Sequence, residues 1–180
     1  MNIMKLLEEI VIEDSIEIEA EPEAVFKFLL DLKDDASYRA WHPNDHISFR
    51  WVKGNPWEVG SIVNAKEYIH GVIHTLKFVV TKMIPNRIIE YTPTFWLFRV
   101  FIPKNSFIIE KTSRGFNFQA VGCYRVGRIG KLFAEKRITE GINSIKKHLR
   151  EEGEYLKNSV EKKIYNKVAA PDRVPSARSR

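Results

Sequence analysis

A histidine and a glutamate near the end of the chain, His148 and Glu152, have a spacing that could serve chemistry. The apolar residues around them recur at helical intervals, and Glu152 falls roughly 40° from the centre of this apolar stripe. A buried carboxylate is costly unless it is paired, hydrogen-bonded or bound to a metal. The His-x3-Glu spacing suits two ligands of one metal ion. A stripe-edge ion pair with a lysine or arginine, or a solvated helix flank, is the alternative interpretation.

Two further ionisable residues, Glu67 and His74, interrupt the apolar faces of two predicted strands. Each shares the alternation of the apolar residues beside it, so each is expected to point with the apolar face. The turn signal His70-Gly71 separates the two strands, which places Glu67 and His74 near each other across one hairpin. We therefore expect both side chains to converge with His148 and Glu152 on one interior.

The loop around residues 38–46 is rich in histidine and contains His42 and His46. Their spacing alone is a weak metal signal, because a proline interrupts the helix that the i, i+4 geometry requires. Taken singly, His42, His70 and His74 are typical of hydrogen-bonded structural histidines. Combined with an inward glutamate and the helix pair, however, a loop histidine completes a set of four nitrogen and oxygen donors.

A mixed set of imidazole and carboxylate donors is compatible with zinc or with iron, manganese or nickel, and disfavours copper(I). A metal with an open coordination position could polarise a carbonyl group and lower the pKa of bound water towards neutrality. The sequence therefore predicts a cofactor that is Zn²⁺ or another divalent transition metal.

The elements that must position these residues follow from hydrophobic periodicity and turn signals. A long proline-free helix is expected from residue 128 to about 162, and a short one over 21–32 with Pro22 at an early position. Residues 34–45 are expected to form a loop or a short helix. Strands are expected at 10–19, 47–53, 61–69, 72–83, 87–92, 105–111 and 116–126.

This order predicts an α+β domain in which a curved antiparallel sheet wraps around the long C-terminal helix. Such an arrangement leaves a core or a cavity between the sheet and the helix. An ordinary core is the default explanation for most of the apolar residues facing it. The residues expected to line a cavity are Trp41, Val63, Ala65, Leu76, Phe78, Ile145 and Leu149.

Length and composition favour one domain, because 180 residues that are 44% hydrophobic form one substantial core and are too few for two ordinary ones. We expect that domain to span 1–161. Residues 162–180 are basic and lack apolar periodicity, which predicts a disordered tail.

The sequence has no apolar run long enough for a membrane span or signal peptide, and its lone Cys123 excludes an internal disulfide. A cytoplasmic location fits.

The layout over about residues 10–161 resembles the helix-grip fold of the START-like superfamily, which includes lipid carriers and polyketide cyclases. More narrowly, the segments WHPNDH, EYIHG and KKHLREEGE resemble the zinc-binding domain of the diacetylphloroglucinol hydrolase family, which cleaves a carbon–carbon bond between an aromatic ring and an acetyl group. This resemblance implies a substrate hydrogen-bond donor at Tyr38. The zinc ligands that it implies are His46, Glu67, His148 and Glu152, with His42 as the rival for the first position and His70 as a further alternative.

Two functions compete. The first is a metal-dependent hydrolase for a small, hydrophobic, carbonyl-bearing compound such as an acylated phenol, with Tyr38, Glu67 or His74 orienting groups and moving protons. The second is a non-catalytic carrier or sensor for a lipid or polyketide-like ligand. Nucleic-acid binding through the basic tail has no recognition motif to support it. The aromatic stretch 92–103 is expected to be a loop at the cavity mouth, an edge strand or a homodimer contact.

Overall fold

The computed structural model describes residues 6–113 and 115–169. Seven strands and four helices follow one another in an order close to the predicted one. The strands are β1 (Leu7–Ile18), β2 (His46–Lys53), β3 (Ile62–Ile69), β4 (Val72–Ile84), β5 (Ile88–Pro93), β6 (Lys104–Lys111) and β7 (Phe116–Gly127). The helices are α1 (Pro22–Leu30), α2 (Asp35–Trp41), α3 (Trp96–Phe101) and α4 (Arg128–Ala169).

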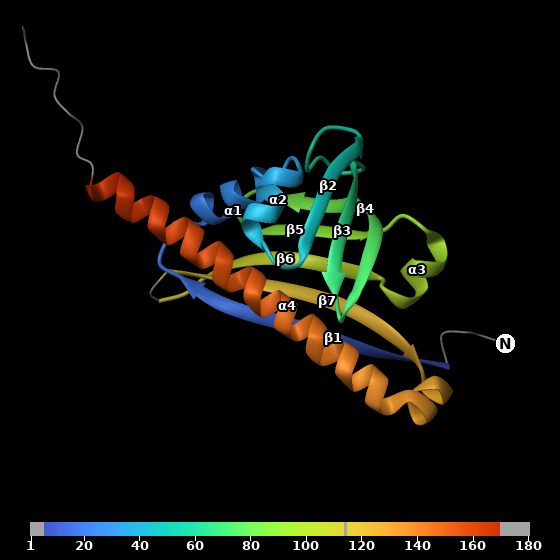
Figure 1. The fold of residues 1–180 in the computed structure, drawn as a ribbon. Coiled ribbons are helices and arrows are strands. Elements are labelled where there is room, and N and C mark those ends of the chain that lie inside the picture. Colours follow the sequence, from blue (N-terminus) through green and yellow to red (C-terminus); the bar gives the residue numbers. More distant parts are fainter. Residues whose placement is uncertain (1–5, 114, 170–180) are drawn as a thin grey trace, which may run out of the picture.

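All seven strands form one antiparallel sheet in the order β1-β7-β6-β5-β4-β3-β2. The sheet curves strongly, and α4 crosses its concave side (Figure 1). Only the β1–β7 pairing joins strands that are distant in the chain. The other strands pair with their neighbours in the sequence, and α3 lies in the connection between β5 and β6. The predicted α+β helix-grip architecture is therefore confirmed.

The β3–β4 hairpin brings the two polar residues of its inner face together. Its turn consists of His70 and Gly71, whose φ angles of 53° and 75° are both positive, as a two-residue turn of the primed type requires. This turn fixes the register, so Glu67 lies directly opposite His74. The predicted proximity of Glu67 and His74 is confirmed.

Helix α2 forms the short helix that the sequence left open between 34 and 45. Asp34 caps it, since its side chain accepts a hydrogen bond from the Ser37 amide while the Ser37 hydroxyl accepts one from the Asp34 amide. The Asp35 carboxylate accepts a hydrogen bond from the Phe49 amide at 2.8 Å and thereby fastens α2 to β2. The helix consequently presents Tyr38 and Trp41 inward, where both are buried.

Helix α4 closes the concave side of the sheet and packs most tightly near its C-terminal half. Gly153 lies so close to β1 that a β-carbon there would stand 3.3 Å from Ile16. Leu156 and Val160 are buried, whereas Leu149 and Ile145, about two and three turns before Leu156, are only partly buried. The helix therefore seals one end of the domain and leaves space under its middle.

Two expectations about the chain ends and loops are corrected. Helix α4 continues to Ala169, so the predicted domain limit at residue 161 falls inside a helix and residues 162–169 are not a disordered tail. The rest of the predicted tail, 170–180, lies outside the described residues. The stretch 92–103 contains helix α3 and is neither a plain loop nor an edge strand, because six of its residues form a compact helical turn.

No helix in the described ranges combines the length and the apolar character needed to cross a lipid bilayer.

The close approach at Gly115 generates a stability prediction. A β-carbon at this position would lie 2.5 Å from the Ile18 carbonyl oxygen, which is backbone and must shift. We expect Gly115→Ala to lower the free energy of unfolding by about 1–3 kcal/mol. Gly141→Ala is the control, because its β-carbon would meet nothing within 4 Å and a helical alanine adds up to about 1 kcal/mol. Urea denaturation measures both, and equal effects would contradict the packing described.

Candidate functional site

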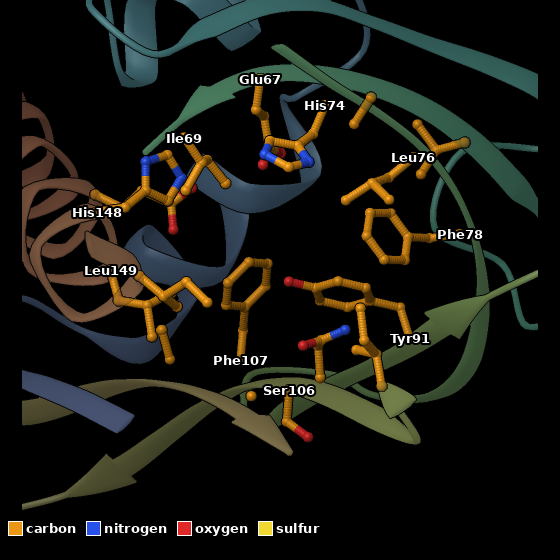
Figure 2. A pocket seen from close by; sticks show the side chains of 18 of the residues that line it. Glu67, Ile69, His74, Leu76, Phe78, Tyr91, Ser106, Phe107, His148 and Leu149 are labelled. Carbon is orange, nitrogen blue, oxygen red and sulfur yellow. The ribbon is translucent and has the colours of Figure 1, made fainter. Parts of the chain in front are cut away.

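A cavity of about 440 Å³ lies between the concave face of the sheet and α4, within the range typical of small-molecule sites. Its walls come from both layers (Figure 2). All seven residues that the sequence predicted to line a cavity do so: Trp41, Val63, Ala65, Leu76, Phe78, Ile145 and Leu149. The space under the middle of α4 is therefore a ligand-sized chamber with mainly apolar walls.

Three ionisable side chains meet where α4 passes the start of β2, and we call them the His–His–Glu group: His46, His148 and Glu152. One potential ligand atom from each lies within 4.8 Å of the others. The ε-nitrogen of His46 is 3.0 Å from a Glu152 carboxylate oxygen, and that of His148 is 3.7 Å from the same oxygen. All three residues are buried. The buried Glu152 carboxylate thus contacts two histidines, and not the lysine or arginine of the alternative interpretation.

Outer partners set the orientation of both histidines. The δ-nitrogen of His46 faces the Tyr38 carbonyl oxygen at 3.0 Å and donates to it, because a carbonyl can only accept. The δ-nitrogen of His148 lies 3.0 Å from the Asp45 carboxylate. Each histidine therefore directs its ε-nitrogen towards Glu152. Such outer hydrogen bonds are the usual way in which proteins orient histidine ligands of a metal.

Aromatic contacts hold this group in place. The Tyr38 ring stacks on the His46 ring, with centroids 3.7 Å apart and an interplanar angle of 2°. The indole N–H of Trp41 donates to the main-chain carbonyl of Glu152 at 2.9 Å. Helix α2 and the loop after it are therefore tied directly to α4 at the site.

His42, the rival loop histidine, is engaged elsewhere. Its δ-nitrogen accepts a hydrogen bond from the Asp45 amide at 3.2 Å, so its ε-nitrogen carries the proton that it shares with Glu151 at 3.3 Å. Burial and the neighbouring histidines His148 and His46 lower the pKa of His42, which favours its neutral form. His42 thus has both nitrogens engaged, and His46 is the loop histidine that reaches Glu152. His42 also forms a second metal-compatible group with Asp45 and His148, so its place as the rival metal ligand stays a prediction.

Glu67 stands apart from the His–His–Glu group. Its carboxylate accepts a hydrogen bond from the Tyr38 hydroxyl, and among the described residues no metal-compatible cluster includes it. Of the four metal ligands predicted from the sequence, the fold therefore brings three together. The fourth, Glu67, is bonded to Tyr38 in the adjoining cavity wall.

The two hairpin histidines lie at the open end of the cavity. His70 occupies the β3–β4 turn and is exposed, and His74 is exposed on β4 although it lines the cavity. The inward direction predicted for His74 is correct, but its position at the mouth separates it from the buried group. His70 is likewise outside every metal-compatible cluster in the described ranges.

Charge and burial act in opposite directions on the His–His–Glu group. Burial alone would raise the pKa of Glu152, but His148 and the hydrogen-bonded His46 lower it overall. Burial alone would lower the pKa of His148, but Glu152, Glu67 and Asp45 raise it overall. The two pKa directions therefore favour an ionised Glu152 carboxylate beside a protonated His148 inside the fold.

A second set of polar groups lies across the cavity and was missed in the sequence: Tyr91, Asn105 and Tyr124. Burial, together with the charges of Glu67 and Glu152, raises the pKa of Tyr124 to about 12 and that of Tyr91 well above its usual range. Both hydroxyls therefore remain protonated donors. Among the described residues, neither these hydroxyls nor the buried Asn105 amide has a side-chain hydrogen-bond partner. Figure 2 shows the Tyr91 hydroxyl directed into the cavity.

Strand alternation was the signal that could have located these residues. Asn105 shares the inner face of β6 with the buried Phe107, and Tyr124 shares the inner face of β7 with the buried Ala120. Gly122 makes room for Tyr124, because a β-carbon there would stand 2.5 Å from its ring. The arrangement offers an apolar chamber with hydrogen-bonding groups at two sides.

The tie between Trp41 and Glu152 gives a testable consequence. Trp41→Phe removes a buried hydrogen bond and leaves a small void, so we expect a loss of about 2 kcal/mol in the free energy of unfolding. Trp51→Phe is the matched control, since the Trp51 indole bond to the Leu32 carbonyl is longer, at 3.3 Å, and only part-buried. Its expected loss is below about 1 kcal/mol. A larger loss in the control, measured by urea denaturation, would contradict the proposed tie.

No protein-family model and no curated protein matches the sequence. Solved structures, by contrast, resemble the fold closely. The Zhui aromatase/cyclase from Streptomyces sp. R1128 aligns with a TM-score of 0.66 and 12% identity, over 87% of this chain and 96% of that one. A point mutant of Thalictrum flavum norcoclaurine synthase, in complex with a transition-state analogue, aligns with a TM-score of 0.65 and 12% identity, over 88% and 98%.

Ara h 8.0201 is a third similar structure, with a TM-score of 0.60 and 15% identity over 86% of this chain and 99% of that one. Each likeness extends over nearly the whole of both chains, although the identities are too low to transfer an activity. The narrower resemblance to the zinc domain of diacetylphloroglucinol hydrolase stays a prediction. The chain has the START-like helix-grip fold.

Proposed function

We propose that the protein binds a small, largely hydrophobic molecule in the cavity under α4. The observation that carries this proposal is the 440 Å³ chamber, whose apolar walls are interrupted by polar groups at two separate places. The norcoclaurine synthase of the same fold is described in complex with a transition-state analogue, which supports the use of this architecture to hold small ligands.

The walls define the chemistry of the ligand. Phe78, Phe107 and Leu149 suit a flat or branched apolar body. The Tyr91 and Tyr124 hydroxyls and the Asn105 amide suit a carbonyl or hydroxyl at one end. The Tyr38–Glu67 pair and the His–His–Glu group suit a second polar group at the other end. An aromatic compound with oxygen substituents at both ends, such as an acylated phenol or a polyketide-like molecule, satisfies both sets.

Ligand binding is tested by filling the cavity. We expect Leu76→Trp, which adds a large ring to the cavity wall, to weaken binding of the neutral fluorescent probe N-phenyl-1-naphthylamine at least about tenfold. Ile73→Trp is the matched control, because Ile73 lies on the outer face of the same strand and is 56% exposed. The probe should bind the control as it binds the wild type. Fluorescence titration measures all three proteins.

Failure of the wild type to bind the probe would contradict the binding proposal, as would equal binding by the Leu76→Trp variant. Circular dichroism shows whether each variant is folded. Displacement of the probe by an acylated phenol would then support the ligand class.

The His–His–Glu group favours a second, more specific function in which the site also holds a divalent transition metal. Two imidazole ε-nitrogens and one carboxylate form a donor set that suits zinc, and the outer contacts to Tyr38 and Asp45 already orient both imidazoles. When bound, such a metal supplies Lewis-acid activation of a carbonyl group.

A hydrolase of acylated phenols would use the residues around the group for orientation and proton movement. The Tyr38 hydroxyl, now bonded to Glu67, would donate to a substrate oxygen, and the Glu67 carboxylate would accept a proton from the reacting group. His74 lies at the mouth, so its role would concern the entering substrate rather than the buried end.

Metal content tests this second function directly. We expect about one equivalent of a transition metal in protein purified without a polyhistidine tag, and its loss in Glu152→Ala, because Glu152 is the carboxylate that both histidines face. Glu151→Ala is the control, since this neighbour is only partly buried and pairs with His42. Elemental analysis that finds no metal in wild-type protein, before or after incubation with zinc, would contradict it and leave the binding function intact.

A further inference from the structure

Helix α3 and the residue before it expose a run of large apolar side chains, which we call the α3 patch: Phe95, Trp96, Leu97, Phe98 and Phe101. Trp96 is 67% exposed and Phe95 is 50% exposed, and the remaining three are between 39% and 47% exposed. No residue of α3, all of which the structure describes, is buried. A helix of this composition would ordinarily turn an apolar side to the core, so the exposure calls for a covering partner.

The patch lies in a segment with only positive charge. From Tyr91 to Ile109 the sequence contains no aspartate or glutamate, whereas it contains Arg99 and Lys104. Lys77 is a third basic residue whose main chain lies next to this segment, because its carbonyl accepts a hydrogen bond from the Thr94 amide at 2.8 Å. All three basic side chains belong to exposed residues. The surface around the patch is therefore complementary to an anionic partner.

The patch is anchored to the wall of the cavity. Ile102, which directly follows α3, lines the cavity, and its main-chain amide bonds to the Phe98 carbonyl at 2.7 Å. The Arg99 side chain donates to the Pro93 carbonyl at 2.6 Å, which holds the helix against the end of β5. In Figure 1, α3 projects from the side of the sheet opposite α1 and α2. The patch is thus a firmly held projection rather than a loose loop.

We propose that the α3 patch docks the protein on the surface of an anionic lipid bilayer. In the docked state the aromatic side chains enter the boundary between headgroups and acyl chains, while Lys77, Arg99 and Lys104 lie at the level of the lipid phosphates. This inference does not require the proposed ligand. If both hold, docking places the cavity wall at Ile102 next to the hydrocarbon from which an apolar ligand would come.

The direction of the side chains favours a bilayer over a second copy of the chain. Phe95 to Phe98 are four consecutive exposed positions, and consecutive helical residues point in different directions around the axis. A folded partner would cover one side of this projection. A fluid bilayer surrounds it, and an aromatic-rich apolar element with flanking basic residues is typical of interfacial binding.

Vesicle sedimentation tests the proposal. We expect the wild-type protein to bind vesicles of phosphatidylcholine mixed with phosphatidylglycerol. The double variant Trp96→Ser/Phe98→Ser should bind these vesicles at least about tenfold more weakly. The control is Val52→Ser/Val59→Ser, which removes two exposed apolar side chains, one near the end of β2 and one in the connection between β2 and β3. This control should bind as the wild type does. Thermal unfolding checks that every variant is folded.

A charge variant separates the two parts of the interaction. Lys104→Gln should weaken binding to the anionic vesicles about fivefold, and should leave the weak binding to pure phosphatidylcholine unchanged. Wild-type protein that stays in the supernatant with anionic vesicles would overturn the proposal. So would a wild-type dimer in light scattering that Trp96→Ser/Phe98→Ser converts to monomer, because a second copy would then cover the patch.

Discussion

The buried carboxylate of Glu152 is the constraint on which the architecture of the site depends. This residue of α4 is only 5% exposed and its side chain faces the interior, where an unpaired charge would be strongly destabilising. His46 and His148 compensate it, and these histidines are oriented in turn by the Tyr38 carbonyl and Asp45. The loop after α2, the start of β2 and the final helix are therefore joined by one polar contact. The cavity begins directly beside this junction.

Much of this arrangement could be predicted from the sequence because its signals are local. Helical periodicity placed Glu152 on the inner face of the last helix, and strand alternation placed Glu67 inward from β3. The choice between His42 and His46 could not be made in this way. Both imidazoles reach α4, His42 at Glu151 and His46 at Glu152, and only the folded loop shows which carboxylate each one meets. Three-dimensional contacts of this kind leave no periodic trace.

The corrected elements show where local signals fail for physical reasons. The basic end of α4 was predicted to be a tail, yet Leu156, Val160, Ile164 and Val168 continue the apolar spacing of the helix, which extends to Ala169. The excess of basic residues in this segment outweighed that signal in the prediction. The segment that forms α3 is as apolar as a strand or a core helix, but it is exposed. Its surroundings, rather than its composition, identify it as a surface element. Tyr91 and Asn105 were not predicted as site residues, because β5 and β6 carry no buried charged side chain on their inner faces that would indicate a polar site.

The central proposal is that the chamber under α4 binds an apolar body with polar ends. Its most direct test is an isotope-filtered NMR experiment with a dihydroxyacetophenone, an acylated phenol small enough for the cavity. We expect intermolecular contacts between the aromatic protons of this probe and the side chains of Phe78, Phe107 and Leu149, which line the cavity. Contacts with exposed residues such as Val59 alone, or no contacts at a saturating concentration, would contradict it.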